Sequence, residues 1–204
     1  MNQHDAERGT AEPGAAEPGA AEPGAAEPGT TASGAAASSG QPDAWQARVD
    51  AVWEDATLAS EDVIARIAEL AAELPDDDPR GPFELGGAHD SAGDEARAGL
   101  LYERAIALGL SGPARAELTV QYGSTLRNLG RTAEAVAELE NGPRDPAHGA
   151  AADAFLALAL HSAGRSDEAL AVALDALIPH LPRYQRSLRG YAAELRERAA
   201  AHDG

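Results

Sequence analysis

Apolar residues recur at helical spacing through most of the chain that follows residue 42. The first run places its large side chains at i, i+4, i+7 and i+8, which is one face of an α-helix: Trp45, Val49, Val52 and Trp53. A second run over residues 63–74 has the same period and stops at Pro75. We therefore expect a helical hairpin over 43–74, with the two tryptophans packed in a core with Ile64 and Ile67. A patch for a partner is the alternative use of the tryptophans.

A pattern of small and large residues returns around Gly93, Gly130 and Gly164, at intervals of 37 and 34 residues. Small residues stand seven positions before each glycine and alanines five positions after it: Gly86, Gly123 and Ala157, then Ala98, Ala135 and Ala169. Two helices of a hairpin cross closely only where both side chains are small, and a glycine can take the left-handed conformation that ends the first helix. The period predicts an array of helical hairpins at about 80–109, 113–142 and 147–179.

Large residues near these small pairs predict where neighbouring hairpins touch. We expect six of them to fill the contacts: Phe83, Leu100, Tyr102, Leu126, Phe155 and Leu160. After the third hairpin, a last helix over 183–202 carries arginines on most of its surface and apolar residues at helical spacing: Tyr184, Leu188, Tyr191 and Leu195. The end of a repeat array must cover its apolar edge and face water. We therefore expect a capping helix with these four residues turned inward.

The hairpin around Gly93 resembles the tetratricopeptide repeat, and its residues at the six characteristic positions are Leu85, Gly86, Gly93, Ala98, Tyr102 and Ala105. The second hairpin ends in Asn141, Gly142 and Pro143 instead of the last alanine, and the third has Ala173 instead of the aromatic residue. Segments 101–105, 124–131 and 155–160 are similar to a bacterial subgroup, the group 5 tetratricopeptide proteins. The resemblance implies an all-α fold, a right-handed α-solenoid of about four stacked hairpins whose concave face binds other proteins.

The first 41 residues have a different composition. Residues 11–30 repeat Ala-Glu-Pro-Gly-Ala four times, the last copy ending in Thr30, so a proline recurs every five residues. Each proline removes a backbone donor, and no side chain larger than Ala is available for burial. We expect a disordered tail over 1–41, which acts as a spacer or binds a partner, followed by one tetratricopeptide repeat domain over 42–204.

Charge and composition exclude several classes of function. The formal net charge is −18, and the 16 basic residues, all arginine, are scattered among carboxylates, so we expect no nucleic acid partner. The absence of lysine is typical of a GC-rich bacterial genome. There is no cysteine, no hydrophobic signal at the start and no apolar run long enough to span a membrane. The expectation is a cytoplasmic protein without a membrane partner.

Polar residues at the ends of the first helices of the hairpins are the candidate binding residues. The resemblance places them on or near the concave face, where they offer hydrogen bonds to an extended peptide or a helix. With polar residues earlier in the second hairpin, the set is Asp90, Ser91, Glu117, Gln121, Ser124, Arg127, Asn128 and His161. The alternative is that these side chains only face water or cap helix ends. A clamp for a carboxylate at Arg127 and Asn128 is disfavoured because lysine is absent.

No residue pattern points to catalysis. The six histidines lack the spacing of a helical zinc site, and neither a phosphate loop nor a nucleophile motif occurs. We therefore expect no enzyme activity, no cofactor and no metal. The predicted function is a non-catalytic scaffold that binds a protein or peptide, and the alternative is a structural homo-oligomer formed by self-association.

Overall fold

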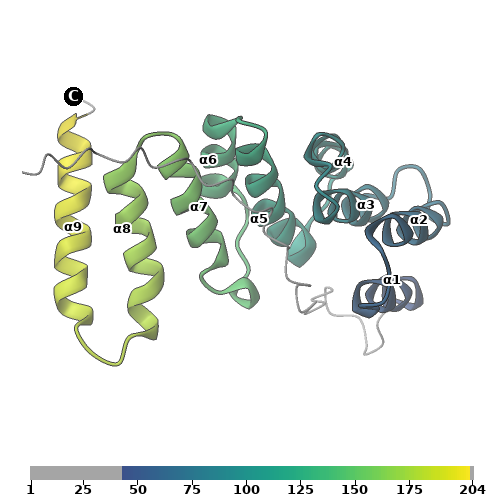
Figure 1. The fold of residues 1–204 in the computed structure, drawn as a ribbon, viewed down its shortest axis with the longest axis horizontal. Helices are drawn as coiled ribbons and strands as arrows, with labels where there is room; N and C mark the ends of the chain where they lie inside the picture. The colour runs from purple at the N-terminus through teal and green to yellow at the C-terminus, as the bar shows by residue number, and fades with distance from the viewer. Residues whose placement is uncertain (1–42, 203–204) are drawn as a thin grey trace, which may run out of the picture.

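The computed structural model describes residues 43–202, which form nine α-helices and two 3-10 turns and contain no strand (Figure 1). In chain order these are α1 (Ala44–Glu54), α2 (Ser60–Ala71), α3 (Arg80–Ser91), α4 (Glu95–Ala107), α5 (Gly112–Asn128), α6 (Thr132–Asn141), η1 (Pro146–His148), α7 (Ala151–Ser162), α8 (Ser166–Leu177), η2 (Ile178–His180) and α9 (Gln185–His202). The predicted tail lies outside the described residues. Its disorder and the domain boundary beside it stay predictions.

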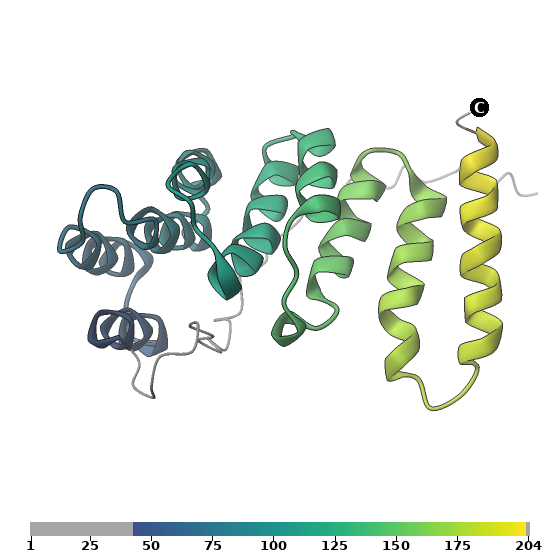
Figure 2. The ribbon, with the colours of Figure 1, turned by 180° about the vertical axis from the view of Figure 1, so that it is seen from behind.

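The helices form antiparallel pairs that stack in a row (Figures 1 and 2). Helix α3 packs on α4, α5 on α6 and α7 on α8, while α5 also contacts α3 and α7, so the first helices of successive hairpins are neighbours. Helices α1 and α2 form the hairpin at one end, and α9 packs on α8 at the other. The predicted all-α array of stacked hairpins with a last helix is confirmed.

The three turn glycines end the first helix of their hairpins as predicted. Gly93, Gly130 and Gly164 have φ values of 79°, 75° and 79°, in the left-handed region where a Cβ is strained. The amide that follows each glycine donates to a carbonyl five residues earlier, for example from Asp94 to His89 at 2.9 Å. This is the bond pattern of a helix C-terminus closed by a left-handed residue, and its recurrence explains the repeat of the glycines.

The small residues seven positions before two of these glycines set the helix crossings. A Cβ added to Gly86 would lie 2.7 Å from the ring of Tyr102, and one added to Gly123 would lie 2.5 Å from Cγ of Leu139. Both large side chains are fully buried. The third hairpin differs: Ala173 occupies the corresponding position and is exposed. With an alanine at both positions, no large side chain fills this crossing.

One predicted contact between hairpins is wrong. Leu100 is 64% exposed, whereas the neighbouring Gly99 is buried and its Cβ position would lie 3.5 Å from Cδ1 of Leu129. Because α4 turns Gly99 toward α5, the next residue along the helix points into solvent. Phe83, Tyr102, Leu126 and Leu160 are buried as expected, and Phe155 packs half-buried against the same core.

The N-terminal hairpin has a core of its own. Trp45 and Ile67 are buried together, and the indole nitrogen of Trp45 donates to the carbonyl of Leu70 at 2.8 Å. Trp53 and Ile64 pack against this core and stay half-buried. The predicted use of the two tryptophans in core packing is confirmed.

The capping helix turns only part of the predicted set inward: Leu195 is buried and Leu188 is half-buried. Ala192 and Leu195 are buried with Ala171 of α8, whereas Tyr184 and Tyr191 are 77% and 57% exposed. The expectation that both tyrosines turn inward is therefore wrong. The small side chains of Ala171 and Ala192 let α8 and α9 approach closely, and Tyr191, next to Ala192, points into solvent. Tyr184 precedes the first residue of α9 and has a φ of 69°.

Candidate functional site

A buried carboxylate lies where α1 meets α3. Glu84 of α3 is only 9% exposed. Its Oε1 accepts a hydrogen bond from Nε2 of Gln46 at 3.1 Å, and its Oε2 accepts one from Nε1 of Trp53 at 3.0 Å. Both donors are neutral and both come from α1. A negative charge is thus held at this junction by hydrogen bonds from neutral groups.

A second set of side-chain hydrogen bonds joins α4 to α5. The hydroxyl of Tyr102 donates to Oε1 of Gln121 at 3.0 Å, and Nε2 of Gln121 donates to Oε1 of Glu117 at 3.1 Å. Gly87 of α3 lies between these hydrogen-bonded groups and α1. A Cβ built on it would lie 3.5 Å from the ring of Trp53 and 3.9 Å from Oε1 of Gln121. The groups on α1, α3 and α5 therefore share one region of the surface.

Asp90 connects the end of α3 to α5. The Thr125 hydroxyl lies 2.8 Å from Oδ1 of Asp90 and 2.9 Å from the carbonyl oxygen of Gln121, and donates to one of them at a time. Thr125 is fully buried. The bond therefore has a structural role in joining two hairpins, besides placing a carboxylate near the site.

Three carboxyl groups of this region have raised pKa values. Burial raises the pKa of Glu84, although its hydrogen bonds from Gln46 and Trp53 oppose this, and the charges of Glu117 and Asp50 raise it further. Burial followed by the Asp50 charge raises the pKa of Glu117. Burial also raises the pKa of Asp90. We call Asp50, Glu84, Asp90 and Glu117 the acidic cluster.

Three carboxylates of this cluster affect the pKa of the Tyr102 phenol. Its pKa is raised well above its ordinary value, first by burial and then by the charges of Asp90, Glu117 and Glu84. No arginine of the described chain contributes to the pKa shifts of Glu84, Asp90 and Glu117. Burial and the mutual repulsion of Glu84, Glu117 and Asp50 thus disfavour the ionised form of Glu84 and Glu117.

The structure brings together three of the eight candidate residues from the sequence, namely Asp90, Glu117 and Gln121. Ser124 is half-buried on α5, and Ser91 and His161 are exposed at the ends of α3 and α7. Arg127 donates to Oδ1 of the exposed Asn128 at 3.2 Å. These five residues lie outside the hydrogen-bonded group around Glu84 and Gln121.

Glu84, Asp50 and Gln46 belong to the site but were not among the candidates. A signal for Glu84 exists in the sequence, since it is a charged residue inside the otherwise apolar segment 82–88. Asp50 and Gln46 carry no such signal. They lie between the core positions of α1, where polar residues ordinarily face water, and only the packing of α1 beside α3 gives them their place.

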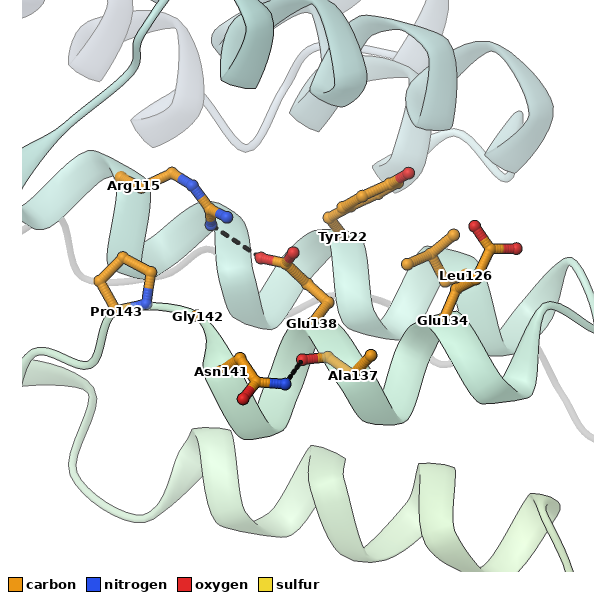
Figure 3. Close-up of a pocket in the computed structure, with 9 residues that line it drawn as sticks. All are labelled: Arg115, Tyr122, Leu126, Glu134, Ala137, Glu138, Asn141, Gly142 and Pro143. Atoms are coloured by element: carbon orange, nitrogen blue, oxygen red, sulfur yellow. Dashed lines mark hydrogen bonds and ion pairs between the residues drawn. The ribbon is translucent and has the colours of Figure 1, made fainter.

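A cavity of about 470 Å³ lies along α5 and α6, away from the acidic cluster (Figure 3). Nη1 of Arg115 reaches Oε1 of Glu138 at 2.8 Å and the Thr119 hydroxyl at 2.6 Å. Tyr122 donates to Glu103 at 2.8 Å, and Glu134 pairs with an arginine outside the cavity. The charged groups around this cavity are satisfied by one another, which favours a structural role.

Residues 43–202 offer neither a metal site nor a membrane-spanning helix. No group of three or more histidine, aspartate or glutamate residues there is arranged to hold a metal ion. No helix of this part of the chain combines the length and the apolar character needed to cross a membrane.

Comparison with known families gives one match. Residues 79–195 match the family model of the tetratricopeptide repeat, from just before α3 to within α9. A comparison with curated proteins found no match. Helices α1 and α2 precede the matched segment, so the acidic cluster combines residues of the family region with Asp50 of the hairpin before it.

Proposed function

Because the chain belongs to the tetratricopeptide repeat family, whose repeats generally mediate contacts between proteins, we propose that it is a non-catalytic scaffold for a protein or peptide. We propose further that the acidic cluster on α1, α3 and α5 receives a basic side chain of that partner. The partner is thus defined by its chemistry, as a segment that carries an arginine or a lysine.

One observation carries the proposal: burial and the charges of Glu117 and Asp50 raise the pKa of Glu84, and no arginine contributes to that shift. Both Glu84 and Glu117 have a raised pKa because burial and like charges disfavour the ionised form. A guanidinium or ammonium group placed beside them would favour the ionised form and form charge-assisted hydrogen bonds. The half-buried ring of Trp53 supplies an aromatic neighbour for a cation.

The other candidate residues would contact the rest of the partner. They continue from the cluster to the ends of α3, α5 and α7 and offer both donors and acceptors: Ser91, Ser124, Arg127, Asn128 and His161. In this proposal the cluster selects a basic residue, and these side chains hydrogen-bond the flanking backbone. Charge complementarity of this kind contributes more to selectivity and association rate than to affinity.

Self-association is the second candidate, and the distribution of charge supports it. Residues 43–78 contain eleven acidic residues and two arginines, whereas residues 181–202 contain five arginines and two glutamates. The two ends of the array thus have opposite charge, which favours contact between the first hairpin of one copy and α9 of another. Such a contact is heterologous and extends into a filament unless it closes into a ring.

The experiment for the first proposal is a binding screen with the full chain. Fluorescent peptides of one length, in which the number and position of arginine, lysine and glutamate vary, would be titrated and followed by anisotropy. The test variant is Asp50→Asn with Glu117→Gln. The matched control is Asp62→Asn with Glu69→Gln, which removes the same two charges from exposed positions on α2.

We expect peptides with arginine or lysine to be selected, with affinity lost in the test variant and kept in the control. An equal loss in both variants would mean that net charge alone attracts the peptides. Selection of peptides without a basic residue would contradict the proposed partner. Solution mass measured on the same samples separates a scaffold from an end-to-end oligomer.

A further inference from the structure

The first half of α9 and the loop before it form a basic surface in an acidic chain. From Ala176 to Ala193 there are three arginines, Arg183, Arg186 and Arg189, and no carboxylate. Arg189 donates a hydrogen bond to the side-chain oxygen Oε1 of Gln185 at 3.3 Å, and within residues 43–202 none of the three arginines forms an ion pair.

The later arginines of the same helix behave differently. Arg196 pairs with Asp175 of α8, and Arg198 pairs with Asp167 at 3.0 Å. The arginine charges in the second half of α9 are therefore balanced by aspartates of α8, whereas those in the first half are not.

Two aromatic side chains accompany these arginines. Tyr184 and Tyr191 are the two most exposed aromatic residues of the described chain. Tyr191 points outward beside the buried Ala192, and Tyr184 lies in the loop before α9. A capping helix normally presents polar residues to water. Exposed tyrosines next to unpaired arginines are therefore not explained by capping.

Gly190 adds a third observation. It lies within α9, where glycine destabilises a helix, yet an added Cβ would meet no atom within 4 Å. At 100° per residue it faces away from the buried Ala192 and lies one turn from Arg186. Packing within the described chain gives no reason for a glycine here. A bare strip of helix backbone beside Tyr191 leaves room for the close approach of another chain.

We infer that this surface binds the Ala-Glu-Pro-Gly tract, residues 11–30, of the same chain. Each copy of the tract places a carboxylate next to a proline ring. The carboxylate matches the forked donors of an arginine, and a proline ring packs well on an exposed aromatic side chain, as proline-rich ligands do in aromatic-lined grooves. We name Arg183, Tyr184, Arg186, Arg189, Gly190 and Tyr191 the tract-binding surface.

The length of the chain permits this contact. Helices in contact lie about 8–10 Å apart, so the six contacts that lead from α1 through α2, α3, α5, α7 and α8 to α9 span about 60 Å at most. An extended chain covers about 3.3 Å per residue, so the 25 residues from Pro18 to Asp43 reach about 80 Å. The earlier copies of the repeat can therefore reach α9 from the start of α1.

The opposite charges at the two ends of the repeat array decide which end binds the glutamates of the tract. The first hairpin and the acidic cluster repel glutamates of the tract, although they lie nearer to it in sequence, whereas the tract-binding surface has the opposite charge. This inference does not depend on the proposed function. It concerns a surface other than the acidic cluster and an occupant within the chain.

The test is paramagnetic relaxation in the full chain. Because the protein has no cysteine, Ala20→Cys gives one attachment site for a spin label in the middle of the tract. We expect faster relaxation of the amides of residues 183–191, and loss of that effect in Arg183→Ala with Arg186→Ala. The control, Arg66→Ala with Arg97→Ala, removes two exposed arginines from α2 and α4 and should keep the effect.

A mixture of labelled chain with isotope-enriched unlabelled chain separates the source of the tract. Effects that appear only within one molecule support the inference. Effects of the same size in the mixture would show that the tract of another copy binds and would overturn the assignment to the same chain. Absence of any effect at residues 183–191, or effects centred on α1 and α3, would also overturn it.

Discussion

The indole N–H of Trp53 donates to Oε2 of Glu84 at 3.0 Å, and this bond joins the N-terminal hairpin to the first repeat of the family region. It also fixes the place of a carboxylate that is nine-tenths buried. The hairpin that precedes the repeats therefore does more than cover their end. It supplies the donors that hold Glu84 and, with Asp50, part of the negative charge of the proposed binding site.

Glu84→Gln is expected to stabilise the protein at neutral pH. The folded state raises the pKa of Glu84 above its ordinary value of 4.5, so ionisation costs more folded than unfolded. The stability that Glu84 contributes to the wild-type protein is therefore lost as the pH rises from the ordinary pKa of the group to its pKa in the folded state. The neutral amide avoids the loss, while its oxygen still accepts from Trp53. Urea unfolding of both proteins should coincide below pH 4.5 and separate above it.

Glu73→Gln is the control of opposite sign. A hydrogen bond from Arg48 lowers the pKa of Glu73. Glu73 therefore stabilises the folded protein at a pH above its ordinary pKa, and this stability is lost as the pH falls. The amide variant should be less stable than wild type at neutral pH and equal to it in acid. If Glu84→Gln also destabilised the protein at neutral pH, the raised pKa of Glu84 in the folded state would be refuted.

Gly86→Ala is expected to destabilise the fold by about 1–3 kcal/mol, because its Cβ would lie 2.7 Å from the buried ring of Tyr102 and force the crossing of α3 and α4 apart. Gly190→Ala is the matched control, since nothing lies near its Cβ, and it should stabilise by about 0.5–1 kcal/mol through helix propensity. Both are measured by thermal and urea unfolding. Equal effects at the two sites would contradict the close crossing.

The ion pair of Arg115 and Glu138 should show strong coupling. The two side chains are 15% and 16% exposed, and either substitution alone leaves a largely buried charge without its partner. We expect Arg115→Met and Glu138→Met each to destabilise by about 1–3 kcal/mol, and the double variant to lose clearly less than the sum. Additive losses in urea unfolding would mean that the two charges act independently.

The fold was accessible from the sequence because its determinants recur. Gly93, Gly130 and Gly164 each close a helix in the left-handed conformation, and Gly86 and Gly123 each meet a large side chain, so a local constraint becomes a visible period. Where the local constraint changes, the prediction was wrong. Leu100 and Tyr191 are large residues at helical spacing, but the neighbouring Gly99 or Ala192 takes the inward position, and Tyr184 lies before the first residue of α9.

The site was predicted only in part. Asp90, Glu117 and Gln121 were identified as polar residues within amphipathic first helices of the repeats, and the structure places them in one region. Asp50 and Gln46 were not identified, because their role depends on α1 packing beside α3, a contact between segments more than 30 residues apart. Spacing along one helix contains no information about such a neighbour.

The most direct test of the central claim follows the carboxyl groups of the cluster themselves. Carboxyl carbon signals of Glu84 and Glu117 in the full chain would be titrated with pH by NMR, alone and with the arginine peptide selected in the binding screen. If a guanidinium lies beside the cluster, the pKa of both groups falls on binding, because an adjacent cation favours the ionised form. If the peptide binds and both pKa values stay where burial has raised them, the basic residue is held elsewhere and the account is wrong.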